Sequence, residues 1–178
     1  MNSEATSTTN IATLSATKLE NTTSRAGIVK VRGYTTVGAF SDGRGQVSID
    51  AREFHSASYP DQVEYGISIT VQAYGTLQQQ NISFVDENEL ESLMEGIEYL
   101  ATVDNKITTM ANFEVDCQTK NNFSICLFSN GEGGIGVCVS SGTVGKTSAF
   151  FNHHHLDDIK KLLVKARAII DAAKIKNQ

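Results

Sequence analysis

The sequence predicts an α+β fold in which one unit, an antiparallel β-meander followed by one α-helix, occurs twice. Apolar and polar residues alternate along several stretches, as they do in strands with one buried and one wet face. Two other stretches have apolar residues three and four apart, as in amphipathic helices. The starts of these two helices align without a gap at an offset of 66 residues, which indicates a tandem repeat. We therefore expect two helices packed on the sheet faces.

The domain organisation follows from length and composition. A chain of 178 residues that is 40% hydrophobic can fill the core of one domain. Residues 1–26 are rich in Ser, Thr, Asn and Ala and predict a flexible tail, although Leu19 and two other apolar residues leave a short docking strand or helix open. Residues 27–178 predict a single domain of two repeats, 27–105 and 106–178.

The alternating stretches place the strands. Ile28 and Val31 begin one strand and residues 34–40 form a second, followed by strands over residues 47–52 and 65–73. In the second half, the expected strands are residues 113–117, 123–127, 135–139 and 147–151.

The helical stretches have recognisable starts. Asp86 is a natural N-cap of the first helix and Glu89 completes a capping box, while Asn152 is expected to cap the second. Gly96 inside the first helix costs about 1 kcal/mol relative to Ala, which indicates a close approach to a sheet. The expected apolar stripes are Leu90, Leu93, Met94, Ile97, Leu100 and Ala101, and then Leu156, Ile159, Leu162, Leu163, Ala166, Ile169 and Ile170.

The repeat also predicts residue equivalences. The offset of 66 pairs Asp86 with Asn152 and Asp50 with Asp116. It further pairs Phe84 with Phe150, Leu90 with Leu156, Ile97 with Leu163, Val47 with Phe113 and Ile49 with Val115, while Tyr65, Ile67 and Ile69 match Phe123, Ile125 and Leu127 at an offset of 58.

No catalytic motif is recognisable, and no cofactor is expected. The stretch from Ser141 to Thr147 resembles a phosphate-binding loop, but the first glycine is missing and a strand follows, so a hairpin turn is the better interpretation. Asp50 and Asp116 give a third-ranked hypothesis, a small enzyme that uses the two carboxylates for acid–base chemistry. Exposed carboxylates on a sheet are ordinary, however.

His153, His154 and His155 suggest a weak metal-site hypothesis. Consecutive helical residues point about 100° apart, so three adjacent histidines do not easily face one ion. Asp157 and Asp158 are the only neighbouring ligands at a useful spacing. We therefore expect no metal site, and exposed polar residues in a first helical turn instead.

The distribution of charge bears on partners. The chain has a net charge of -5, which argues against a phosphate-binding surface. Residues 86–104 hold seven acids and no base, whereas residues 152–176 hold six bases and three acids. Two helices of opposite charge are expected to pack together, within the chain or between copies. The alternative is that their charged faces are simply exposed to solvent. The candidate binding residues are Lys160, Lys161, Lys165, Arg167, Arg32, Arg52, Asp50 and Asp116.

The three cysteines give a register prediction. Cys126 and Cys138 lie between inward-facing apolar residues, so both point outward on their strands. A hairpin that turns around Glu132 places them directly opposite each other, a possible cross-strand thiol pair, with Cys117 alone on the core face.

The order of strands then helix, twice over residues 27–175, resembles the layout of the PUR-alpha and Whirly single-strand-binding families and of uncharacterised bacterial proteins. The resemblance implies nucleic-acid binding on the open sheet face, yet here that face carries residues such as Ser48, Asp50 and Asp116. The leading hypothesis is therefore a non-catalytic binding or assembly module with a protein partner or a second copy. A single-stranded nucleic-acid binder is the alternative. No membrane span or signal peptide is recognisable, so we expect a soluble protein, with the cytoplasm favoured.

Overall fold

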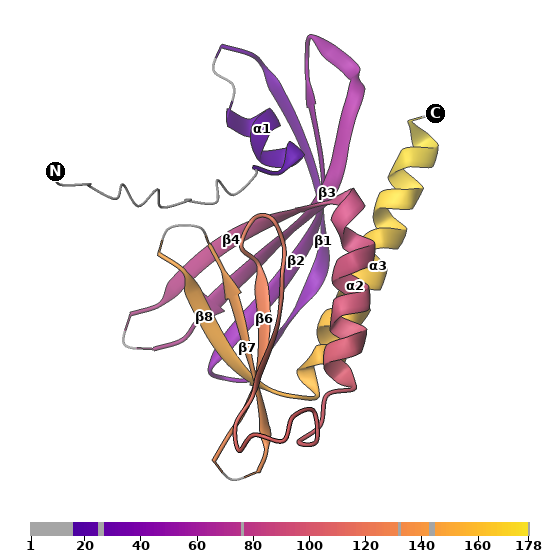
Figure 1. The fold of residues 1–178 in the computed structure, drawn as a ribbon. Coiled ribbons are helices and arrows are strands. Elements are labelled where there is room, and N and C mark those ends of the chain that lie inside the picture. The colour runs from indigo at the N-terminus through magenta and orange to yellow at the C-terminus, as the bar shows by residue number, and fades with distance from the viewer. Residues whose placement is uncertain (1–15, 25–26, 76, 132, 143–144, 178) are drawn as a thin grey trace, which may run out of the picture.

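The fold consists of two four-stranded antiparallel sheets, each a meander followed by a helix, as predicted (Figure 1). A computed structural model describes residues 16–24, 27–75, 77–131, 133–142 and 145–177. Among these residues, no helix is both long and apolar enough to cross a membrane.

Sheet A has the order β1-β2-β3-β4 and leads into helix α2. Its elements are β1 (Lys30–Ser41), β2 (Gly45–Ser56), β3 (Tyr59–Ala73), β4 (Gln79–Asp86) and α2 (Glu87–Ala101). The two strands expected between Ile28 and Phe40 are one continuous strand, β1. A bulge between Thr36 and Gly38 interrupts its pairing with β2, and the extra residue, Val37, points into the core.

Sheet B repeats this order as β5-β6-β7-β8 and leads into helix α3. Its elements are β5 (Glu114–Gln118), β6 (Ser124–Ser129), β7 (Ile135–Ser141), β8 (Thr147–Asn152) and α3 (His155–Lys176). The loop that resembles a phosphate-binding loop leads into strand β8, so the hairpin interpretation is confirmed for its described residues. Thr143 and Val144 lie outside them.

The inner faces of both sheets and one stripe of each helix form a single core. Each helix crosses to the other repeat, because α2 packs on β5 as well as on β3, and α3 packs on β1 and β2. The predicted stripe is buried at Leu93, Ile97, Ile159 and Leu163, whereas Ala101 is exposed. Close packing explains Gly96, because a Cβ there would lie 2.6 Å from Sγ of Cys117 on β5.

The two helices lie side by side and run antiparallel (Figure 1). Acids of α2 lie beside bases of α3. Lys174 Nζ lies 2.7 Å from Glu87 Oε1, and Lys160 Nζ lies 2.9 Å from Glu98 Oε1. The oppositely charged helices therefore pack together within one chain, which is one of the alternatives that the charge pattern left open.

The N-cap position predicted for Asp86 is confirmed, whereas the capping box with Glu89 and the cap at Asn152 are wrong. Asn152 is the last residue of β8, and His154 is the N-cap of α3. Asp86 does occupy the N-cap position of α2, but its side chain makes no cap hydrogen bond to that helix, and Glu89 instead accepts a bond from the amide of Lys120. Strand β8 ends at Asn152 just as β4 ends at Asp86, but two turn residues, His153 and His154, then precede α3.

The carboxylate of Asp86 instead binds a helix in the segment expected to be a tail. Helix α1 (Lys18–Ser24) packs on the outer face of sheet A, and the amides of Lys18 and Leu19 donate to Asp86 at 2.9 and 3.3 Å. Leu19 is fully buried above Gly66. The flexible-tail expectation is therefore wrong for Lys18–Ser24, where the alternative of a docking helix holds. Residues 1–15 lie outside the described residues.

The repeat is real at the level of strand order, but its strand equivalences need correction. The first strands of the two sheets are β1 and β5, whereas the offset of 66 paired residues of β2 with β5. Equivalent rows across the outer faces are Thr36, Asp50, Ser68 and Phe84 in sheet A, and Asp116, Cys126, Cys138 and Phe150 in sheet B. Asp50 therefore corresponds to Cys126, and Asp116 to Thr36. Every strand has the same alternation of apolar and polar residues, so matching each strand to the wrong partner in the other sheet still aligned apolar with apolar residues.

Candidate functional site

The basic residues predicted on the second helix do not form a free cationic surface. Lys160 pairs with Glu98 of α2, Lys161 lies 3.7 Å from Asp158, and Arg167 lies 3.2 Å from Asp171. The ammonium group of Lys165 donates at 2.8 Å to the backbone carbonyl of Val37 in the bulge of β1. Each of these cations has a partner within the chain, and all of them lie on the helix layer and not on an open sheet face.

Asp50 and Asp116 are not brought together either. Asp50 lies on β2 of sheet A and Asp116 on β5 of sheet B. The guanidinium of Arg52 neutralises Asp50 at 2.8 Å, donates at 2.8 Å to Ser68 Oγ, and lies 5.0 Å from the centre of the Tyr34 ring. This arrangement orders the outer face of sheet A, on which the ring of Tyr34 is exposed.

The three histidines stand at the start of α3, where the ring centroids of His154 and His155 lie 4.2 Å apart. Only His154 is exposed, so the expectation of three exposed polar residues is wrong for His153 and His155. His155 stacks on Phe40, with ring centroids 5.2 Å apart, and its Nδ1 lies 2.9 Å from Asp158 Oδ2. Within the described residues, no three His, Cys, Asp or Glu side chains are placed to hold a metal ion. His155 thus helps to fix the first turn of α3 against β1.

The cysteines follow the predicted register. Cys126 of β6 is directly opposite Cys138 of β7, with Leu127 opposite Val137 and Ile125 opposite Val139 on the core face. Both thiols are free and partly exposed on the outer face of sheet B, and Cys117 lies apart from them against α2.

A different feature, which we call the arm, is the most conspicuous exposed surface. The arm comprises residues 28–34 and 52–64, that is, the start of β1 and the β2–β3 hairpin. It projects between α1 and the C-terminal end of α3 (Figure 1). Several of its large apolar side chains are accessible: Val29 is 71% exposed, Tyr34 68%, Tyr59 61% and Val31 40%. In the part of the chain that the structure describes, no other segment carries as many.

One side of the arm is the unpaired edge of strand β1. β1 is the first strand of sheet A, and among the described residues no strand pairs with its outer edge. Helix α3 crosses β1 at the bulge, where Lys165 bonds to Val37 and Leu162 lies against Gly38. The segment from Lys30 to Thr36 lies on the arm side of that crossing.

The direction of the backbone groups along this edge can be worked out. The carbonyl of Val29 accepts a bond from the amide of Ala57, so Val29 faces the hairpin. Backbone groups alternate in direction along an antiparallel strand, so Val31 and Gly33 also face β2, while Lys30, Arg32 and Tyr34 direct their N–H and C=O groups away from the sheet. The arm therefore presents a row of backbone donors and acceptors beside accessible apolar side chains.

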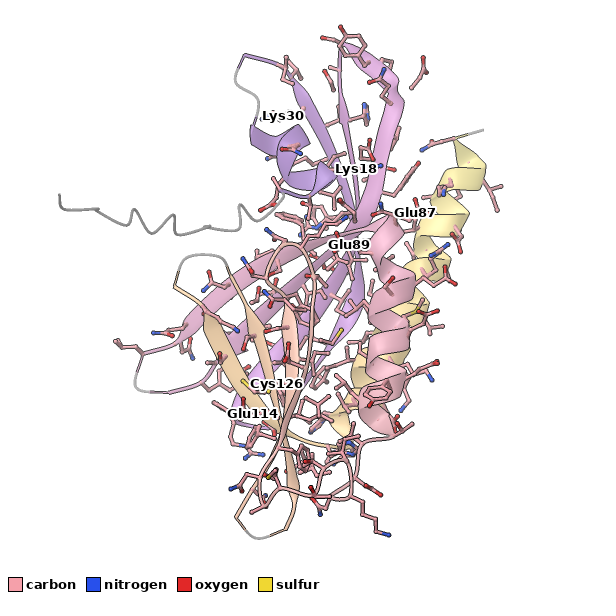
Figure 2. All side chains as sticks on the ribbon, in the orientation of Figure 1. Lys18, Lys30, Glu87, Glu89, Glu114 and Cys126 are labelled. Atoms are coloured by element: carbon pink, nitrogen blue, oxygen red, sulfur yellow. The ribbon has the colours of Figure 1, made fainter. Side chains whose placement is uncertain are left out.

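Hollows lie on both sides of the arm. One of about 230 Å³ is lined by Tyr34 and Tyr65 of sheet A and by Ile169 and Ala173 of α3. Another of about 250 Å³ lies between the hairpin and α1, close to Tyr59 and Lys18. Figure 2 shows Lys18 and Lys30 on this side of the molecule, near α1. The arm is thus flanked by a hollow on each side.

Sequence reasoning did not find this surface. Val29, Val31 and Tyr34 look like ordinary strand residues, and their exposure depends on how far the arm extends beyond the helices. Comparisons with protein-family models, with curated proteins and with solved structures find no match to this chain.

Proposed function

We propose that the protein is a non-catalytic assembly module that associates with a second copy of itself through the outer edge of β1. The observation that carries the proposal is the edge of β1 from Arg32 to Thr36, with which no described strand pairs, beside the accessible side chains of Val31 and Tyr34. A long apolar edge strand is a template for pairing with another chain. Closed dimers with two-fold symmetry are the commonest assemblies of identical chains.

Charge selects the register of such a pair. An antiparallel pair centred on Val31 would place Lys30 opposite Arg32 of the second copy, and one centred on Arg32 would oppose two arginines. Like charges directly opposite each other are destabilising. A pair centred on Gly33 avoids both contacts and places Arg32 opposite Tyr34 of the second copy, where a cation–π contact is favourable. Tyr34 already accepts such a contact from Arg52 of its own chain.

The test is light scattering over a wide range of protein concentration. The wild type is expected to pass from monomer to dimer. Arg32→Pro is expected to stay monomeric, because it deletes an outward donor and leaves the bonds to β2 in place. Arg32→Ser is the matched control: it removes the charge, keeps the N–H, and should still dimerise. A wild type that stays monomeric throughout, or an Arg32→Pro variant that dimerises normally, would contradict the proposal.

A second pair of variants avoids proline. Tyr34→Lys places a cation opposite Arg32 of the second copy and should weaken the dimer. Tyr59→Lys adds the same charge at the tip of the hairpin, outside the proposed register, and should not. Equal effects of the two substitutions would show that net charge and not strand pairing controls association.

One observation favours a second function, binding of single-stranded nucleic acid. The exposed ring of Tyr34 beside the guanidinium of Arg52 could stack with a base on the outer face of sheet A. Affinity for a labelled oligonucleotide should then fall steeply with salt and be lost in Tyr34→Ala. The pairing of Arg52 with Asp50 and of the α3 cations with acids makes this the weaker candidate.

A further inference from the structure

We infer that Cys126 and Cys138 are a site of reversible oxidation, at which a small-molecule disulfide joins the two thiols into a cross-strand disulfide. This inference is independent of the assembly proposal, because the site lies on sheet B and the arm belongs to sheet A.

The backbone brings the two residues within reach. The amide of Asn130 donates to the carbonyl of Gly134 across the β6–β7 hairpin. Hydrogen-bonded pairs recur at every second residue along an antiparallel ladder, so Cys126 and Cys138 form such a pair. The Cα atoms of a pair of this kind are about 5.5 Å apart, which is within the range that a disulfide spans.

The side chains share one accessible face. Both thiols lie in the row between Asp116 and Phe150 on the outer face of sheet B, and Phe150 is 50% exposed, so solvent reaches the row. Figure 2 shows Cys126 on this sheet, with Glu114 nearby. The thiol of Cys138 lies 3.6 Å from Ser140 Oγ, and that of Cys126 lies 3.5 Å from the carbonyl of Leu127. These are weak contacts that do not prevent rotation toward each other.

The two thiols have different roles in the reaction. Burial and, to a smaller extent, the neighbouring Glu114 carboxylate raise the pKa of the Cys126 thiol, which makes its thiolate scarce at neutral pH, and we therefore assign it the second step. The Cys138 thiolate attacks one sulfur of the oxidant, breaks its S–S bond and releases one small thiol. The Cys126 thiolate then attacks the Cys138 sulfur, forms the protein S–S bond and releases the second small thiol. The protein loses two protons and two electrons, and the oxidant is reduced to two thiols.

The acids beside the pair predict which oxidant reacts faster. Glu114 and Asp116 are exposed next to Cys126, so a cationic disulfide such as cystamine should react faster than the anionic oxidised glutathione. The difference should shrink at high salt, because screening weakens exposed charges. Asp116→Asn should reduce it as well.

The experiment treats the whole protein with cystamine, blocks the remaining thiols with N-ethylmaleimide and maps the products by mass spectrometry. Trypsin leaves both cysteines in one peptide, residues 121–146, which should lose two hydrogens. Cleavage after Glu132 should then leave its halves linked, and reduction should restore both thiols. Cys117→Ser should behave as the wild type, whereas Cys126→Ser should stop at the mixed disulfide on Cys138. Two free or separately modified cysteines in the wild type would overturn the inference, as would a link through Cys117.

Discussion

Gly66 of β3 and Gly136 of β7 occupy equivalent positions in the two sheets, and each lies beneath a large apolar side chain from a different source. Gly66 is opposite Arg52 and Asp86, and Gly136 is opposite Phe128 and Asn152. Leu19 of α1 lies over Gly66, whereas the ring of Phe128 from the neighbouring strand lies over Gly136. Sheet A therefore uses an added N-terminal helix where sheet B uses its own side chain.

The contact at Gly66 predicts that Gly66→Ala weakens the docking of α1. The new Cβ would overlap the backbone carbonyl oxygen of Val85 and lie 2.6 Å from Cδ1 of Leu19. Such overpacking costs about 1 to 3 kcal/mol, and hydrogen exchange should accelerate in α1 and at the end of β4 around Val85 before it does elsewhere. Gly75→Ala, where a Cβ meets nothing within 4 Å, is the control and should leave both measurements unchanged.

The contact between Gly96 and Cys117 predicts that the effect of Gly96→Ala on stability changes sign when Cys117 is replaced by Ala. Gly96→Ala alone should destabilise the protein, because its Cβ would lie 2.6 Å from Sγ of Cys117. In a Cys117→Ala background the space is free, and the same substitution should stabilise by up to about 1 kcal/mol through helix propensity. Urea denaturation measures both values. An equal effect of Gly96→Ala in the two backgrounds would refute the close contact.

The helix stripes predict large costs for core truncation. Ile97→Ala and Leu163→Ala should each cost about 2 to 5 kcal/mol, because both side chains lie in the shared core. Val164, one residue along α3, is 54% exposed, and Val164→Ala should cost much less. Chemical denaturation with an unchanged midpoint for Ile97→Ala or Leu163→Ala would contradict the packing of these helices.

The thiols predict a loss of stability at alkaline pH. Burial raises the pKa of Cys117, with a smaller contribution from Asp116, so the folded protein holds this proton more tightly than the unfolded chain. The resulting stabilisation is complete below the ordinary thiol value of 9.0 and is lost as the pH rises through the higher folded value. The unfolding free energy of the wild type should therefore fall more steeply over this window than that of Cys117→Ser. Parallel profiles would contradict this.

Local sequence patterns predicted the buried helix faces, which follow from the helical period, and the strand register, which follows from the alternation of inward and outward residues. The stripe through Leu93 and Ile97 follows from the helical period, and the pairing of Cys126 with Cys138 follows because a one-residue slip would turn a buried face outward. The match of Asp50 with Asp116 failed, since strands with the same alternation are interchangeable in an alignment.

Long-range contacts account for the features that the sequence did not reveal. The docking of α1 depends on Asp86, which is 67 and 68 residues away from the amides that it binds. The exposure of Tyr34 depends on where α3 crosses β1, because Lys165 bonds to Val37 at the bulge and α3 leaves the edge of β1 around Tyr34 accessible. Neither relationship leaves a local pattern in the sequence around the residues concerned.

Amide hydrogen exchange along β1 tests the assembly proposal most directly. The N–H groups of Arg32 and Tyr34 point away from sheet A, so they should exchange rapidly in dilute protein and become protected as concentration rises. The N–H groups of Val31 and Gly33 already face β2 and should be protected at every concentration. If Arg32 and Tyr34 exchange rapidly at concentrations where the protein is dimeric, the copies do not pair through this edge.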